Sequence, residues 1–540
     1  MTAGVRRQRR DAPPALPPAR WRRLPGLLTV LAAVAGVGYR LALLLHDAPP
    51  TNSDEATMGL AALHIAQGRE FPVWFYGQEY MGTLEAWLAA PLFALAGPST
   101  LGLRLPNLAL YALFVLLAWR LTVRLTGDRW FALLVVALLA LGSDRIVKNQ
   151  LIAGGGYPEM NPAGVALALL AYDLAAGRPG RRLPRWAAWG LLAGLMVWVD
   201  PLVLPYAAGT GAVLVAFRWR ELRGQAGALL GLGALVGAAP LLAHSLTAGR
   251  NPLDAVLTAG GAGEPAGWAE RLHGGLLLGP PLGMGFCSPS HCVGWQLWWA
   301  AALPLLLAVA AGTAWRTLRA VPPAAANGDC PRSTDTVGAA VSLALVGAAV
   351  TTLAVYAASA AAGRTPIESS RYLSCLLISV PVLLWPVCAA RRRRGAPSGA
   401  LRRAGSVGVL AATLGTAAVA TAGAIGAAPD AHAAEARHAV LVATLREHDV
   451  RHVYGGYWTC NRLTLASGEH VLCAVVDDEL RPGHDRYLPY RRAVRRSAAP
   501  AWVAPAGSPL AARLDERLRA EPDTLDLVTI PGWRIYLPRR

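Results

Sequence analysis

Long apolar runs separated by short arginine clusters constrain the fold of this 540-residue chain more than any other feature. Leu, Ala, Val and Gly fill these runs, and roughly 20 mostly apolar residues are enough for a transmembrane helix. Hydrophobic residues make up 54% of the chain and charged residues only 16%. Both values depart from those of soluble domains. The chain is therefore predicted to be a mainly α-helical protein that crosses a membrane many times.

The apolar runs predict about eleven transmembrane spans. They lie near residues 24–46, 104–126, 129–143, 161–177, 186–200, 202–217, 226–247, 295–315, 337–361, 372–390 and 405–427. The first run is too long for the apolar region of a signal peptide and no small-residue cleavage site follows it, so we interpret it as an uncleaved span. Arg40, inside this run, is expected to extend its guanidinium to the outer interface.

Arginine clusters fall on alternate connections between these spans. They comprise Arg124 and Arg129; Arg178, Arg181, Arg182 and Arg185; Arg218, Arg220 and Arg223; Arg316, Arg319 and Arg332; and Arg391–Arg394. The N-terminal segment 1–23 is also basic. The positive-inside rule places all of these in the cytoplasm. An odd number of spans then places the C-terminus outside, and the net charge of +18 reports membrane topology and not a nucleic-acid partner.

Three regions follow from this topology. A cytoplasmic tail covers residues 1–23, and a transmembrane domain covers residues 24–428 with a long outside loop at 47–103. Residues 429–540 are predicted to form a small extracytoplasmic α/β domain, because helix-like and strand-like runs alternate there. That domain contains no P-loop, GxSxG or HExxH motif. Its Tyr457-Trp458 pair could either stack on a sugar or belong to the hydrophobic core.

Four cysteines are predicted to lie outside, where disulfides persist. Cys287 and Cys292 are close in one loop, and Cys460 and Cys473 are close in the C-terminal domain, so two short-range disulfides are plausible. The alternative for the first pair is a zinc site with His291, but a fourth ligand is not evident.

The outside loop 47–103 is predicted to contain two amphipathic helices on the membrane surface. Asn52 or Ser53 can cap a helix that begins at Asp54, with the acids of its first turn complementing the helix dipole. The second helix covers residues 82–96 and follows the aromatic turn YGQEYMG.

Two shorter outside segments carry charged residues. Segment 143–162 has three glycines and two prolines, which indicate a tight bend next to Glu159. Segment 362–372 ends in Arg371-Tyr372, and an arginine at the interface can bind a phosphate with two parallel hydrogen bonds.

These acids suit base catalysis at one cavity. Asp54 and Glu55 are adjacent and cannot share a helix face, so one can face a site while the other caps the helix or pairs with a cation. Asp54 and Glu159 come from separate loops, which suits a base and an orienting partner. General-base assistance is typically worth about 10²–10⁴ in rate. The structural alternative for Asp54 is a stabilising acid at a helix N-terminus.

Three motifs in order resemble GT-C membrane glycosyltransferases, most closely the family-39 type that includes protein O-mannosyltransferases and aminoarabinose transferases. The first is the loop that begins NSDEATMGL, with an acidic pair, an interface helix, a Y-G-x-x-Y turn, and a second interface helix that ends in LRLP. The second is GGGYPEMNP, where many members have Asp in place of Glu159. The third is ESSRYLSCL, which resembles an Arg-Tyr motif at the start of a late span. The resemblance covers the layout of residues 20–390.

The resemblance implies transfer of a sugar, with inversion, from a polyprenyl-phosphate donor to a glycan, lipid or protein acceptor on the outer face of the membrane. The composition, rich in Ala, Gly and Arg, indicates a high-GC genome and so predicts a bacterial plasma membrane. The resemblance also implies that Asp54 is the base, that Glu55 and Glu159 orient acceptor, donor or a cation, and that Arg371 and Tyr372 hold the lipid phosphate. The aromatic turn then lines the substrate site through Tyr76, Gln78, Glu79 and Tyr80.

Two departures from the family limit what carries over. The turn YGQEYMG lacks the basic residue and the paired prolines of the aminoarabinose type, so the identity of the sugar does not transfer. The chain also lacks the extended acidic motif of oligosaccharyltransferases. A divalent metal is therefore possible but not indicated, and no cofactor is predicted.

Two rival functions make different predictions. A transporter or flippase for a lipid-linked or anionic substrate would have internal repeats and charged residues in mid-span, whereas here no repeat is evident and the acids cluster at one face. A non-catalytic assembly protein that binds glycans would tolerate replacement of Asp54. An outside active site requires a donor that the membrane delivers, and it requires Asp54, Glu159 and Arg371 to meet at one cavity.

Overall fold

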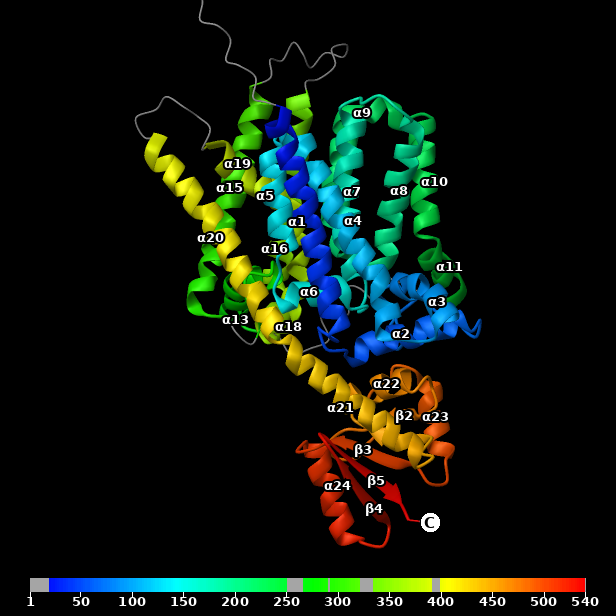
Figure 1. The fold of residues 1–540 in the computed structure, drawn as a ribbon. Coiled ribbons are helices and arrows are strands. Elements are labelled where there is room, and N and C mark those ends of the chain that lie inside the picture. The colour runs from blue at the N-terminus through cyan, green and yellow to red at the C-terminus, as the bar shows by residue number, and fades with distance from the viewer. Residues whose placement is uncertain (1–18, 250–265, 290–291, 321–333, 391–398, 540) are drawn as a thin grey trace, which may run out of the picture.

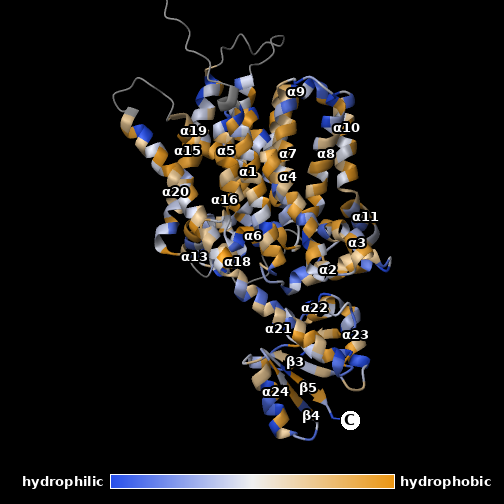
Figure 2. Ribbon diagram, in the orientation of Figure 1, coloured by the Kyte–Doolittle hydropathy of each residue, from blue (hydrophilic) through white to orange (hydrophobic). Residues whose placement is uncertain are grey.

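The computed structural model describes residues 19–249, 266–289, 292–320, 334–390 and 399–539. A bundle of long helices forms the larger part, and a small α/β domain packs against one end of it (Figure 1). Colouring by hydropathy shows apolar residues along the length of the bundle helices and many more polar residues in the small domain (Figure 2). Both parts of the predicted fold class are therefore confirmed.

The helices of the bundle run side by side in Figure 1. They are α1 (Ala19–Leu45), α4 (Thr100–Thr126), α5 (Arg129–Ala140), α7 (Tyr157–Ala175), α8 (Arg182–Val199), α9 (Leu204–Leu222), α10 (Gln225–Gly237), α15 (Trp298–Arg319), α16 (Thr334–Ala358), α19 (Val380–Ala390) and α20 (Gly399–Gly426). Short 3-10 segments precede three of them: η1 (Pro201–Val203), η3 (Gly294–Leu297) and η5 (Ser370–Ser379).

Within the described residues, seven helices are long and apolar enough to cross a membrane, or up to nine if each of two bent pairs is one span. The bent pairs are α5 with α6 (Asp144–Leu151), at 89°, and α10 with α11 (Ala239–Ala248), at 60°. The predicted span at 226–247 is therefore a broken helix, whereas the predicted span at 129–143 contains α5 and ends at the bend before α6. Two further predicted spans correspond to α7 and α8. Both helices lie in the bundle, but neither is among the seven long apolar helices or the two bent pairs. The chain is a multi-pass membrane protein, and the number of eleven spans stays a prediction.

The two ends of the bundle differ in charge and in structure. Four of the predicted arginine clusters have residues in the described chain, and these lie where α4 ends, between α7 and α8, and where α9 and α15 end, all at the upper end in Figure 1. Arg332, Arg391–Arg394 and residues 1–18 of the basic N-terminal segment lie outside the described residues. The lower end carries the small domain, the long loop and several short helices. These short helices include α6, α13 (Trp268–Leu272), α14 (Gly279–Gly283), α17 (Ala360–Arg364) and α18 (Pro366–Ser369). The alternation that the arginines predicted is thus present, and the direction of the bundle in the membrane remains a prediction.

Glycines allow α8 and α10 to pack with their backbones in contact. A Cβ atom on Gly190 or Gly194 would collide with the carbonyl oxygens of Leu230 and Ala234. Glycines spaced four residues apart are the usual means by which membrane helices approach closely, because lipid offers no hydrophobic drive for their association.

Arg40 corrects an expectation from the sequence. Its guanidinium does not reach the outer interface but is completely buried, 3.7 Å from the centre of the Tyr111 ring. It donates to carbonyl oxygens of Leu139, Ala140 and Leu141 at the bend after α5, and its Nε donates to Gln150 on α6 at 2.7 Å. The carbonyls at a helix C-terminus have no partner inside the helix and attract a cation. Arg40 therefore fixes the bend that positions α6.

We expect Arg40→Met to lower the free energy of unfolding by about 2–3 kcal/mol, because buried carbonyls at the bend lose a charged donor. The measurement is the midpoint of thermal unfolding in detergent. The control is Arg23→Met, which removes an exposed arginine from the same helix. Equal midpoints for the two variants would contradict the role of Arg40 at the bend.

The long loop contains α2 (Ser53–Ala66) and α3 (Leu84–Ala96), close to the predicted ranges. Asn52, one of the two predicted caps, accepts a hydrogen bond from the Glu55 N–H at 2.8 Å. The position of α2 on the membrane surface stays a prediction. The structure adds that the small domain packs against α2 and that most of its side chains are buried. Helix α3 keeps exposed apolar residues, namely Trp87, Leu88 and Leu95, as a helix on a membrane surface would.

The small domain is built on a five-stranded sheet with the order β2-β1-β3-β5-β4. Its strands are β1 (His452–Gly455), β2 (Leu472–Val475), β3 (Ala501–Pro505), β4 (Leu525–Ile530) and β5 (Trp533–Pro538). The first three are parallel, and β5 and β4 add to β3 as an antiparallel pair. The sequence did not predict β4. The helices of the domain are α21 (Ala428–Glu447), α22 (Tyr457–Ala466), α23 (Leu488–Arg496) and α24 (Pro509–Ala520).

Both plausible disulfides are present. Cys287 is joined to Cys292 with Cα atoms 5.0 Å apart, and Cys460 is joined to Cys473 with Cα atoms 4.9 Å apart. The second disulfide ties α22 to β2. The zinc alternative does not fit, because both of its cysteines are in a disulfide; His291 lies outside the described residues.

Candidate active site

A cavity of about 420 Å³ lies at the lower end of the bundle, between loop 47–103, α6, the α18–η5 segment and α22. This volume falls in the range of small-molecule sites, roughly 300–1,000 Å³. Asp54 and Arg371, two predicted site residues, both line it. The other lining residues are Asn52, Asp144, Arg145, Lys148, Asn149, Ile152, Gly154, Tyr157, Pro289, Ile367, Glu368 and Trp458.

Asp54 is held from the small domain. The Tyr457 hydroxyl donates to Asp54 Oδ1 at 2.5 Å, and Arg486 Nη2 lies 3.4 Å from the same oxygen. Arg486 Nε also donates to the Tyr457 hydroxyl at 2.8 Å. Both bonds to the carboxylate converge on Oδ1, and the side chain of Asp54 remains 30% exposed. The small domain thus orients the carboxylate and leaves it accessible.

Glu55 points away from the cavity. Its two carboxylate oxygens accept hydrogen bonds from Arg104 Nε and Nη2, each at 2.6 Å, and both side chains are almost completely buried. Arg104 belongs to α4 and also donates to the Pro49 carbonyl at 2.8 Å. Of the two adjacent acids, Asp54 therefore faces the site and Glu55 pairs with a cation, which was one of the alternatives that the sequence left open.

Donor groups without partners gather on one side of the cavity. Arg145 Nε and Asn149 Nδ2 on α6, and Arg371 Nε on η5, are buried and have no hydrogen-bond partner within the described residues. Lys148 adds a further cation on α6. Buried N–H groups are seldom left unpaired, and this arrangement of cations and N–H donors suits an anionic oxygen ligand.

Aromatic rings surround Arg371. Its guanidinium carbon lies 5.6 Å from the ring centre of Tyr157 and 5.5 Å from that of Tyr372. The two rings are nearly parallel, with centres 6.5 Å apart. Tyr372 therefore supports Arg371 and does not itself line the cavity.

The side chains of the aromatic turn YGQEYMG lie in two different environments. Gln78 Oε1 accepts from Arg486 Nη1 at 2.8 Å, so this side chain lies beside Asp54. Burial raises the pKa of Tyr80, and the charges that act on it include those of Arg486, Arg371 and Asp54. Glu79 is partly buried in the same turn.

Tyr76, the remaining predicted residue of the turn, lies in the contact between loop 47–103 and the small domain. Its hydroxyl bonds His64 Nδ1 at 2.7 Å and donates to Glu70 at 3.0 Å. His64 is buried and its Nε2 lies 3.1 Å from both Glu469 and the Tyr490 hydroxyl. These contacts fasten the small domain onto α2, away from the cavity.

Glu159 does not reach the cavity either. It is buried in the first turn of α7, and both carboxylate oxygens lack a hydrogen-bond partner among the described residues. Glu85 lies close enough for its charge to act on Glu159. Glu85 accepts backbone hydrogen bonds from the triglycine turn 154–156, and burial raises the pKa of Glu85 to about 8. Gly155 and Gly156 have φ values of 107° and 89°, which favour glycine.

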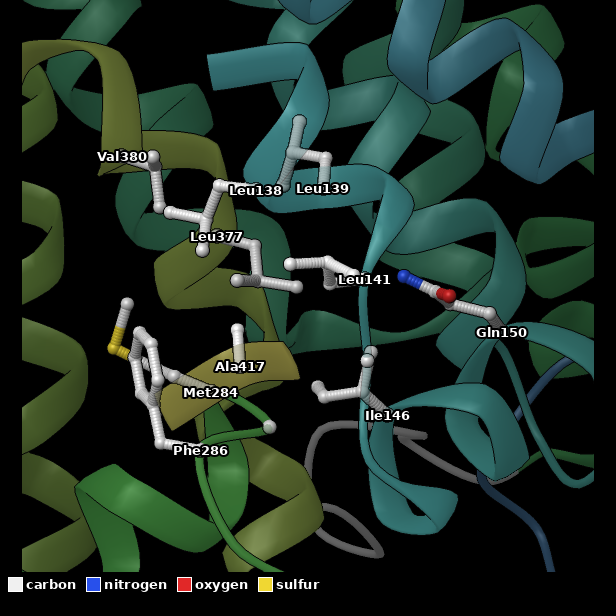
Figure 3. A pocket seen from close by; sticks show the side chains of 12 residues that line it. Leu138, Leu139, Leu141, Ile146, Gln150, Met284, Phe286, Leu377, Val380 and Ala417 are labelled. Carbon is white, nitrogen blue, oxygen red and sulfur yellow. The ribbon is translucent and has the colours of Figure 1, made fainter. Parts of the chain in front are cut away.

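A much smaller cavity of about 20 Å³ lies along α6 and is lined mostly by apolar side chains (Figure 3). Leu139, Leu141, Met284 and Phe286 contribute to it, and Gln150 adds an amide at its edge. Its volume suffices for about one water molecule. The larger cavity is therefore the candidate site.

The sequence analysis missed two groups of residues. Arg145, Lys148 and Asn149 are spaced i, i+3 and i+4, which places them on one face of a short helix, and this spacing was a usable signal. Tyr457 and Arg486 belong to a separate domain, and no local pattern pairs them with Asp54. Within the described residues no group of three His, Cys, Asp or Glu side chains is arranged to hold a metal ion.

Comparisons with known proteins give a partial sequence match and a wider match of the fold. No family model matches the chain. The chain is 34% identical over 169 residues to the undecaprenyl phosphate-alpha-4-amino-4-deoxy-L-arabinose arabinosyl transferases of Pseudomonas aeruginosa (strain UCBPP-PA14) and Pseudomonas paraeruginosa (strain DSM 24068 / PA7). The match covers 28% of this chain and 28% of each relative, so the chain matches little more than a quarter of their length.

The fold has a wider match. The oligosaccharyltransferase of Archaeoglobus fulgidus, in its apo form, is similar over 97% of this chain and 75% of its own, with a TM-score of 0.52 and 12% identity. That likeness concerns the fold alone. The sequence relatives and the Archaeoglobus oligosaccharyltransferase all belong to the GT-C superfamily. The predicted resemblance to that superfamily is therefore confirmed.

Proposed function

We propose that this protein transfers a sugar from a polyprenyl-phosphate-linked donor to an acceptor hydroxyl on the outer face of the membrane, with inversion. One observation carries the proposal: a single cavity has an accessible, oriented carboxylate in Asp54 and two cationic side chains, Arg145 and Arg371, whose buried Nε atoms have no hydrogen-bond partner in the part of the chain that the structure describes. Transfer of a sugar from a phosphate carrier requires a general base and an anion-binding site at the same cavity. The names of the sequence relatives, which are undecaprenyl-phosphate sugar transferases, support the same substrate class.

In the proposed reaction, Asp54 accepts the proton of the acceptor hydroxyl while the hydroxyl oxygen attacks the anomeric carbon. Oδ2 is the oxygen available for this step, because Tyr457 and Arg486 both contact Oδ1. The bond from the anomeric carbon to the phosphate oxygen breaks on the opposite face, which inverts the configuration. Arg371, Arg145 and Lys148 stabilise the charge that the departing lipid phosphate gains. Glu55 and Glu159 act through the structure of the loop and of α7, not on the substrate.

The position of the cavity favours a membrane-delivered donor. Its lining residues come from α6, α18 and α22, which lie at the lower end in Figure 1, opposite the described arginine clusters. The positive-inside rule assigns those clusters to the cytoplasm. The cavity and the small domain would then face outside, where cytosolic nucleotide sugars are absent. A lipid carrier reaches such a site within the plane of the membrane.

Arg371→Ala is expected to raise the KM for a polyprenyl-phosphate sugar about tenfold or more and to lower kcat, because a charged hydrogen bond to the phosphate is worth about 1.5–3 kcal/mol. The assay follows donor consumption by the purified protein with a panel of polyprenyl-phosphate pentoses and hexoses. Arg371→Lys should recover part of the loss, since it restores charge without the planar geometry.

Arg364→Ala is the matched control, because Arg364 is an exposed arginine of the same segment. Its kinetic constants should equal those of the wild type. If the wild type consumes none of the donors but moves lipid-linked sugars between the leaflets of vesicles, the protein is a flippase and the proposed function is wrong.

A further inference from the structure

Trp458 is an exposed aromatic side chain on the wall of the candidate active site. It is 64% exposed, although large aromatic side chains usually bury most of their surface. It lines the same cavity as Asp54 and Arg371. It belongs to α22, which lies in the small domain (Figure 1). Residues of both parts of the protein therefore line the cavity.

The backbone that carries Trp458 is firmly held. Ser53 Oγ donates to the carbonyl of Tyr457 at 2.7 Å, and the Asn461 amide donates to Ser53 and Thr57 of α2 at 2.9 and 3.0 Å. The disulfide from Cys460, two residues after Trp458, fixes the start of α22 to strand β2 of the sheet. The Tyr457 ring meets Trp458 edge to face, with centres 5.1 Å apart. A fixed backbone that carries an exposed aromatic ring is well suited to bind a ligand by stacking, because little conformational entropy is lost when the ligand binds.

The topology of the sheet points to the same place. Strand β1 lies between β2 and β3, and the chain leaves β1 towards β2 by way of α22. In such α/β sheets ligands bind beyond the carboxyl ends of the parallel strands, where the direction of connection reverses. Trp458 follows directly after the carboxyl end of β1, in the first turn of α22.

The chemistry around the ring selects the ligand. Polar and charged residues dominate the lining, among them Asn52, Asn149 and Asp144, whereas Trp458 offers one broad apolar face. A ligand that fits both has an apolar face and hydrogen-bonding edges. A sugar ring has both, because its C–H bonds form a face and its hydroxyls an edge.

We propose that Trp458 is the stacking platform for the acceptor, and that the acceptor is therefore a carbohydrate chain. This inference rests on the proposed function, which assigns a sugar donor and an acceptor to this cavity. Arg145, Lys148 and Arg371, which the bundle supplies, occupy the donor side. Trp458 comes from the small domain, as does Tyr457, which orients the base Asp54. The sugar stacked on Trp458 presents its hydroxyl to Asp54.

The experiment measures acceptor and donor separately on the full-length purified protein. Labelled oligomannose, oligoarabinose and oligoglucose serve as acceptors, and release of sugar to water from the donor is followed without acceptor. Trp458→Ala should raise the KM of the accepted oligosaccharide about tenfold or more, as loss of a central tryptophan contact does. The donor KM and the hydrolysis of donor should stay unchanged. Trp458→Phe should stay close to the wild type, because it keeps an aromatic face.

Trp268→Ala is the matched control. Trp268 has the same exposed fraction, 64%, but belongs to α13 and does not line the cavity. Its acceptor KM should be that of the wild type. An unchanged acceptor KM in Trp458→Ala would overturn the inference, as would a wild type that transfers only to peptides or lipid alcohols.

Calorimetric titration of the same oligosaccharides without donor separates this inference from the proposed function. Wild-type binding that weakens about tenfold in Trp458→Ala supports the platform even if no donor is consumed. Donor hydrolysis without binding of any of the three oligosaccharides overturns the platform and leaves the proposed function standing.

Discussion

Asp54→Asn is expected to lower sugar transfer about 10²–10⁴-fold, because the amide cannot accept the proton of the acceptor hydroxyl. The amide oxygen can still accept the hydrogen bond from Tyr457, so the loop keeps its structure. The measurement is kcat with a saturating polyprenyl-phosphate sugar, together with the midpoint of thermal unfolding. We expect the rate to fall while the midpoint stays that of the wild type.

Full activity of Asp54→Asn would remove Asp54 as the base and would favour a non-catalytic role for the cavity. Binding of the donor provides the control within the same variant. Because the proposed reaction places the acceptor at Asp54 and the phosphate at Arg371, the donor KM should change little in Asp54→Asn. A large rise in donor KM with unchanged kcat would instead place Asp54 in donor binding.

Glu55→Met is expected to destabilise the protein by about 3–5 kcal/mol, because it leaves the buried charge of Arg104 without a partner. The two side chains are 0% and 1% exposed, and the pair joins α2 to α4. The measurement is the midpoint of thermal unfolding, which should fall well below that of the wild type and below that of Asp54→Asn. Adjacent acids of one helix would then give opposite results, one losing activity and the other stability.

The double variant Glu55→Met/Arg104→Met is the matched control for the buried pair. Replacing both members of a buried ion pair by apolar residues of similar size is often neutral or stabilising. We therefore expect the double variant to regain most of the stability that the single variant loses. A double variant as unstable as Glu55→Met would show that the loss comes from packing and not from the unpaired charge.

Much of the fold could be read from the sequence, because hydropathy and charge are local properties. Apolar runs identified the bundle, and the arginine clusters identified one end of it. Helix α2 and its Asn52 cap followed from residue types next to one another. The break between α10 and α11 was missed, because an apolar run has the same hydropathy whether its helix is straight or bent.

Arg40 shows where local patterns fail. An arginine near the end of an apolar run usually extends to the interface, but here the carbonyls of another helix surround it. Those carbonyls come from residues about a hundred positions later in the chain. The sequence contained both partners and no local sign that they meet.

By itself, the sequence determined that this is a helical membrane protein with its acidic loops at one end, and it placed Asp54 and Arg371 among the candidates. Only the tertiary structure decided which of the two adjacent acids faces the cavity. It also brought Arg145 of α6 and Trp458 of the small domain to that cavity, and it brought Tyr457 and Arg486 of the small domain to Asp54. The reason is physical: residues 403 and 432 positions beyond Asp54 meet it through packing of separate domains. Periodicity and spacing describe only neighbours along the chain.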